Sequence, residues 1–124
     1  TSLHRAVVLR HAAVIRVLIA AGAEPEAIDG SGWAPLHRAA RNGRPEVATV
    51  LLELGANLAT KDSAGRTALH WASKNGRTEM VTYLLEAGAD VSAQEDSKST
   101  ALHYATGVGH FAVSNILLDH GAET

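Results

Sequence analysis

Seven histidines in 124 residues are the side chains that first suggest chemistry, because imidazole is a common metal ligand and a general base near neutral pH. Four of them recur at one constant step along the chain: His4, His37, His70 and His103. A zinc site needs its ligands about 2 Å from one ion. Whether these rings can meet therefore depends on the elements that carry them. The chain has no cysteine, so thiol chemistry and cysteine-based zinc sites are excluded.

The step between these histidines is shared by other residue types, which indicates a tandem repeat rather than a chance spacing of histidines. Four further columns keep it: Leu3, Leu36, Leu69 and Leu102; Ala6, Ala39, Ala72 and Ala105; Gly22, Gly55, Gly88 and Gly121; and Gly43, Gly76 and Gly109.

Each repeat reads as two short helices followed by a loop. The first helix is predicted over 35–42, where Pro35 suits the first helical position and Gly43 can take the left-handed conformation that ends a helix. The second helix is predicted over 45–54, where apolar residues at i, i+3, i+4 and i+7 form one face. Its counterpart in the next repeat is predicted over 78–87.

Residues 67–94, TALHWASKNGRTEMVTYLLEAGADVSAQ, resemble an ankyrin repeat, and residues 34–61 and 100–124 carry close copies. Residues 1–24 form a more divergent copy, so the resemblance covers essentially the whole chain. It implies an all-α dominated repeat solenoid of stacked antiparallel helix pairs with β-hairpin-like finger loops. We expect a single domain over 1–124. Its units are 1–28 (partial), 29–61, 62–94 and 95–124 (partial).

The resemblance implies that the four periodic histidines are structural, with rings that hydrogen-bond to backbone and to a threonine three residues earlier. The glycines at 43, 76 and 109 are expected to be structural as well. Stacked helices lie about 8–10 Å apart, so histidines carried one per layer cannot share an ion. We therefore predict no metal and no cofactor. A metal-dependent enzyme remains the competing hypothesis for these histidines.

The first-helix segments 34–45, 67–78 and 100–111 contain no Asp or Glu, whereas the second helices are acidic. In the family the first helices form a concave wall, so this wall is predicted to be basic and to attract an acidic partner. The alternative interpretation is a solvated helix face. The cations on it are Arg38, Arg41, Arg44, Lys74 and Arg77.

Arg38, Trp71 and Tyr104 share one column of the repeat on this side, and Trp, Tyr and Arg are frequent anchors of interfaces. Arg38 could also stack on Trp71. For Trp71, packing against the next unit is an equally weighted alternative. The residues predicted to bind a partner are Trp33, Arg38, Arg41, Asn42, Lys61, Arg66, Trp71, Lys74, Asn75 and Tyr104.

The function predicted from these observations is a non-catalytic scaffold that binds a protein or an acidic extended peptide on its concave face. The alternative is an internal spacer of a longer array that meets its neighbours through uncapped ends, with the chain otherwise a monomer or weakly associated end to end. A net charge of −2 and acidic fingers make nucleic acid an unlikely partner. We expect no small-molecule substrate, no membrane insertion, and an intracellular location in cytosol or nucleus.

Two residues depart from the repeat pattern at positions that favour glycine. Lys98 stands where other fingers have Gly32 and Gly65, and Arg10 stands where other first helices end in glycine. If these positions require a positive φ, each substitution costs about 1 kcal/mol.

Overall fold

The computed structural model describes residues 12–122, and within them seven helices and no strand occur. The inner helices are α3 (Pro35–Asn42), α5 (Ala68–Lys74) and α7 (Ala101–Val108). The outer helices are α2 (Ala12–Ala20), α4 (Pro45–Glu53), α6 (Thr78–Glu86) and α8 (Phe111–Asp119).

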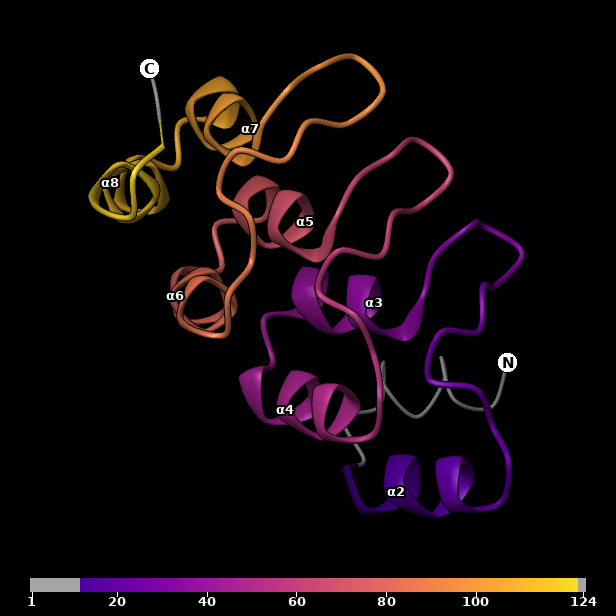
Figure 1. Ribbon diagram of the computed structural model, residues 1–124. Helices are drawn as coiled ribbons and strands as arrows, with labels where there is room; N and C mark the ends of the chain where they lie inside the picture. The colour runs from indigo at the N-terminus through magenta and orange to yellow at the C-terminus, as the bar shows by residue number, and fades with distance from the viewer. Residues whose placement is uncertain (1–11, 123–124) are drawn as a thin grey trace.

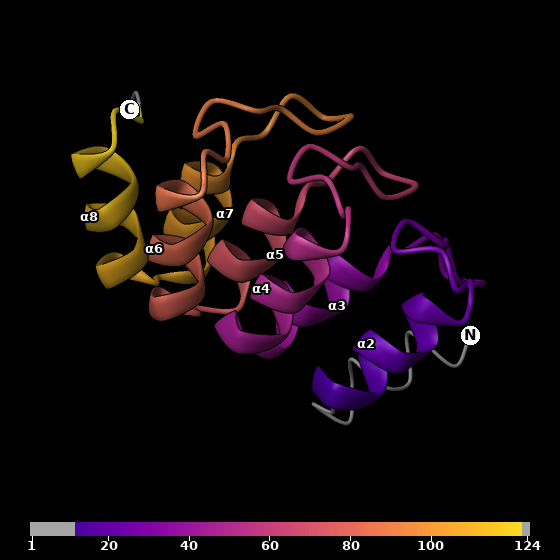
Figure 2. The same cartoon turned by 60° about the horizontal axis from the view of Figure 1, so that its bottom comes forward.

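The helices form two parallel rows (Figure 1). Each inner helix packs on the next inner helix and on the outer helix that follows it, and the outer helices pack along their own row. The finger loops, residues 21–34, 54–67 and 87–100, connect each outer helix to the next inner one and project from one side of the stack (Figure 2). This arrangement confirms the predicted repeat solenoid of helix pairs.

Helix boundaries follow the sequence closely. The first helix predicted over 35–42 is confirmed, while the second helices end at Glu53 and Glu86, one residue earlier than predicted. Gly43 ends α3 with φ at 71°, and a Cβ there would lie 2.6 Å from Cδ of Arg77 in the next unit. That glycine therefore serves both the helix end and the close approach of the neighbouring layer.

The core lies between the two rows. Leu36 on α3, Leu51 on α4, and Met80 and Leu84 on α6 are almost fully buried, as is Leu117 on α8. Burying one such side chain contributes about 1.5–3 kcal/mol, so the rows are held together mainly by this apolar layer. The inner helices are thereby fixed in a regular series with one face left to solvent.

Lys98 adopts a φ of 68°. Among the described residues, no other residue except glycine has a positive φ. Gly32 and Gly65 have φ of 82° and 78° at the same place in their fingers. The prediction that this finger position needs a left-handed backbone is therefore confirmed. The corresponding predictions for Arg10 and for His4 fall outside the described residues.

Candidate partner-binding surface

The buried periodic histidines, His37 and His70, each tie an inner helix to the finger loop that follows it. At His70, Nδ1 accepts the backbone N–H of Thr67 at 3.0 Å, and Oγ1 of Thr67 lies 3.0 Å from the same nitrogen. Because a backbone N–H can only donate, Nδ1 carries no proton, and Nε2 donates to the carbonyl of Ser99 in the following finger at 3.0 Å. Burial lowers the pKa of His70, which matches a neutral ring.

His37 is held similarly: Nδ1 accepts the N–H of Ala34 at 2.9 Å, and Nε2 contacts the carbonyl of Thr60, at an earlier place in the following finger loop, at 3.0 Å. Burial lowers its pKa as well. In the last unit Oγ1 of Thr100 lies 3.0 Å from Nδ1 of His103, so the expected threonine contact is present there too. Both ring nitrogens of the two buried histidines are thus engaged within the fold, and residues 12–122 contain no group of three potential metal ligands.

A carboxylate in each finger organises the base of the loop. Oδ1 of Asp62 accepts the backbone N–H groups of Ala64 and Arg66, both at 2.9 Å. Oδ2 accepts Nε of Arg66 at 3.0 Å and the indole Nε1–H of Trp71 at 2.9 Å. Burial raises the pKa of Asp62, but these hydrogen bonds outweigh it and the pKa is lowered.

The neighbouring fingers use the same device at the same separation in sequence. Oδ2 of Asp29 accepts NH2 of Arg38 at 2.7 Å, and Oε2 of Glu95 accepts the hydroxyl of Tyr104 at 3.0 Å. Burial raises the pKa of Asp29, but the bonds from Arg38 and from backbone N–H groups hold it at about 2. Backbone hydrogen bonds and the Tyr104 hydroxyl lower the pKa of Glu95.

Two tryptophans and two arginines form a continuous stack along the finger bases. The rings of Trp33 and Trp71 have centroids 4.3 Å apart. Arg38 lies over Trp33 at 4.5 Å, and Arg66 lies over Trp71 at 4.4 Å. The suggestion that Arg38 stacks on Trp71 is wrong, because its bond to the carboxylate of Asp29 holds it beside the tryptophan of its own finger.

This stack changes the interpretation of the predicted binding residues. Trp71 is only 6% exposed, covered by its neighbours in the stack, so of its two interpretations packing is the one that the structure favours. Arg38, Arg66, Trp33 and Tyr104 are half-buried. Their polar or cationic groups already have partners within the fold, so they form a rigid platform rather than free side chains.

Arg41 and Lys74 are both exposed, as is Lys61, whereas the other predicted residues are buried or half-buried. Arg41 and Lys74 occupy the last turns of α3 and α5, where a cation also suits the helix dipole. Arg41 lies 5.4 Å from the ring of Trp33, and the ammonium of Lys74 lies 5.3 Å from the ring of Trp71. Within residues 12–122 neither forms a salt bridge. These two cations are therefore available to a partner.

The remaining predicted residues, Asn75, Asn42 and Lys61, are less well placed than Arg41 and Lys74 to contact a partner on the inner helices. Asn75 is half-buried and its side-chain amide donates to the carbonyl of Trp71 at 2.9 Å. Asn42 is half-buried at the end of α3. Lys61 is exposed, but it lines a different groove, which it shares with Leu52 and Tyr83 of the outer helices.

The functional role that sequence reasoning missed is that of the finger carboxylates. Asp29, Asp62 and Glu95 contribute to the acidity of the fingers, but each one also fixes a predicted anchor: Arg38, Trp71 and Tyr104 respectively. They recur at the same step as the periodic histidines, and that spacing was the signal that they belong to the repeat.

Models of ankyrin repeats match the chain over residues 3–52 and 58–124. The protein belongs to the ankyrin repeat family, whose domains typically bind other proteins and are typically non-catalytic. A search of curated proteins found no match to the chain. Of the helices in the described part, none has the length and apolar character needed to cross a bilayer.

Proposed function

We propose that this ankyrin repeat domain binds an acidic, extended segment of a partner protein along its inner helices, with Arg41 and Lys74 making the direct charge contacts. The observation that carries the proposal is that these two cations are exposed and lack a salt bridge among the described residues. They also occupy equivalent places in adjacent units, so one segment crossing both units can meet both.

The aromatic stack supports this role indirectly. Trp33 and Trp71 fix the platform beneath the two cations, and Arg38, Arg66 and Tyr104 hold that platform to the fingers. A rigid platform reduces the entropy lost on binding. Asn42 and Asn75 follow the two cations in sequence and are proposed as flanking polar contacts. The site is non-catalytic in this proposal, and the domain acts as an intracellular monomer.

The test is a selection of random peptides displayed on phage, using the native chain as bait. Enriched peptides should contain Asp and Glu, and they should lose about tenfold in affinity for the Arg41→Ala/Lys74→Ala double variant. Selection of peptides without acidic residues would overturn the proposal. Equal binding by the double variant would overturn it as well.

A spacer role within a longer array is a second candidate, favoured by apolar side chains that are exposed on α7 and α8, the last helix pair that the structure describes. Val108, Phe111 and Leu118 are exposed there, with Phe111 at 71%. Small-angle scattering over a concentration series tests this candidate. End-to-end association that is abolished by Phe111→Ser supports it, and a concentration-independent monomer argues against it.

A further inference from the structure

The repeat contains an internal comparison between successive junctions of the finger loops. At the junction of loops 21–34 and 54–67, the side chain of Glu26 lies between the two loops. Its Oε1 accepts the backbone N–H of Asn57 at 3.1 Å, and its Oε2 accepts the hydroxyl of Thr60. This junction is therefore closed by an oxygen acceptor that the chain itself supplies.

At the next junction, between loops 54–67 and 87–100, the three counterparts are Ala59, Asp90 and Ala93, each one repeat further along the chain. The side chain of Ala59 has no hydrogen-bond acceptor in place of the Glu26 carboxylate, and Ala93 has no hydroxyl in place of that of Thr60. All three line a groove of about 1160 Å³. Within residues 12–122 the backbone N–H of Asp90 meets no protein acceptor. The groove is thus the place that a Glu26-like side chain would fill.

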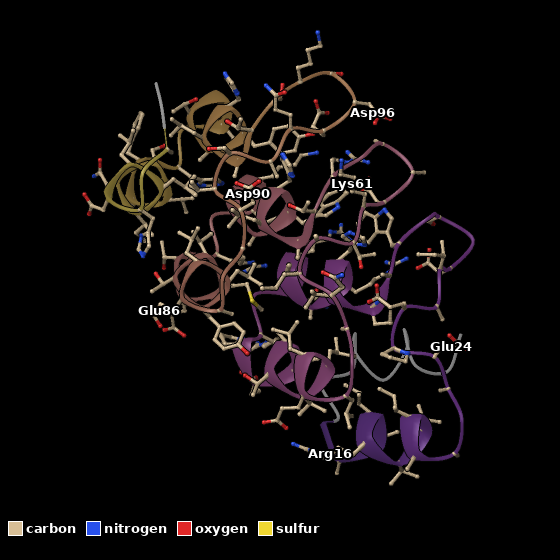
Figure 3. The ribbon with its side chains drawn as sticks, in the orientation of Figure 1. Arg16, Glu24, Lys61, Glu86, Asp90 and Asp96 are labelled. Carbon is tan, nitrogen blue, oxygen red and sulfur yellow. The ribbon has the colours of Figure 1, made fainter. Side chains whose placement is uncertain are left out.

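The walls of this groove limit what can enter. Much of the lining is small and apolar, including Ala56, Ala87 and Ala89, which suits the aliphatic part of a side chain. Its charged groups are Glu53, Lys61 and Asp90 (Figure 3 labels the last two).

Of the charged groups in the groove, Asp90 is the residue that carries the unfilled N–H, so its carboxylate bears most directly on the choice between a carboxylate and an amide. Its Oδ1 accepts the N–H of Ser92 at 2.9 Å, while Oδ2 meets no donor in the described part of the chain. A carboxylate placed at the Asp90 N–H would be repelled by this side chain, whereas Asn57 at the preceding junction is neutral. A primary carboxamide matches both groups, because its oxygen accepts the N–H and its NH2 donates to Oδ2.

We propose that the groove between loops 54–67 and 87–100 is a second binding site, which takes a glutamine side chain from a partner segment. The carboxamide replaces Glu26 of the preceding junction and bonds to the backbone and side chain of Asp90. Because Arg41 and Lys74 do not line this groove, the site is separate from the basic surface of the inner helices.

The test uses N-acetylglutamine amide as the probe and the native chain labelled with ¹⁵N. Titration should shift the amide resonance of Asp90 saturably. N-acetylnorleucine amide and N-acetylglutamate should each bind at least about fivefold more weakly, because the apolar norleucine side chain makes neither hydrogen bond and the glutamate carboxylate is repelled by Asp90. Absence of a saturable shift at Asp90, or equal affinity for the three probes, would overturn the proposal.

A variant that fills the groove from within separates specific binding from general surface contact. Ala59→Gln supplies the amide from the chain itself, as Glu26 does at the preceding junction. It should shift the Asp90 resonance without any probe and should abolish the response to the probe. Glu46→Gln, which adds a glutamine on the outer helix α4 outside the groove, should leave the response unchanged. Unchanged probe binding in Ala59→Gln would contradict the proposed site.

Discussion

The indole nitrogen of Trp71 donates a 2.9 Å hydrogen bond to Oδ2 of Asp62, nine residues earlier in the same unit. The same separation joins Arg38 to Asp29 and Tyr104 to Glu95. In this column the donor changes from unit to unit while the finger carboxylate stays. The side chains that sequence alone favoured as binding anchors are therefore also the side chains that fix the fingers to the inner helices.

Asp62→Asn should lower the free energy of unfolding by about 2 kcal/mol, because each carboxylate oxygen of Asp62 accepts two hydrogen bonds and an asparagine side chain has only one oxygen. The NH2 group of the asparagine then faces two of these donors, which are left without an acceptor in a buried position. Urea unfolding followed by circular dichroism measures the change. Asp96→Asn on the exposed finger tip is the control, expected to fall within about 0.5 kcal/mol of the native chain. Equal stability of the two variants would contradict the bracing role of Asp62.

Helices and strained positions were predictable from sequence because their causes are local. The proline that begins α3, the glycine after it and the spacing of apolar residues define 35–42 without tertiary information. The positive φ of Lys98 followed from the glycines that occupy its column. The difference between the exposed Arg41 and Lys74 and the paired Arg38 and Arg66 was not predictable, because it depends on which side chains meet a finger carboxylate in three dimensions.

Lys98→Gly should raise the free energy of unfolding by up to about 1 kcal/mol, because glycine adopts φ of 68° without the strain that a Cβ imposes. The matched control is Gly65→Ala, whose new Cβ would lie 2.4 Å from Oδ1 of Asp96, and it should destabilise. Thermal unfolding measures both. An unchanged or lower melting temperature for Lys98→Gly would show that the left-handed backbone at this position is not a source of strain.

Ser73→Ala should stabilise the domain by about 1 kcal/mol, because removing a buried, unsatisfied hydroxyl relieves its desolvation cost. The hydroxyl of Ser73 is fully buried on α5 and has no hydrogen-bond partner among the described residues. Ala40 already occupies the same place on α3. Calorimetry measures the melting temperature. A loss of stability would mean that the hydroxyl has a bonding role within the fold.

Stability should fall as the pH drops below about 6.5. Burial lowers the pKa of His37 and His70 from the ordinary value of 6.5, so below that pH the unfolded chain binds protons that the folded chain does not. The finger carboxylates have lowered pKa values and act only at more acidic pH. Urea unfolding at pH 7.5 and 5.5 isolates the histidine contribution. Equal or greater stability at pH 5.5 would contradict neutral, buried rings.

The most direct test of the central claim is the affinity of one selected acidic peptide for two charge-matched variants. The first is Arg41→Ala/Lys74→Ala. The second is Arg16→Ala/Lys98→Ala, which removes two exposed cations from an outer helix and a finger tip. Fluorescence anisotropy should show about tenfold weaker binding for the first and nearly native binding for the second. Equal affinities for the two variants would mean that the inner-helix cations do not form the binding surface.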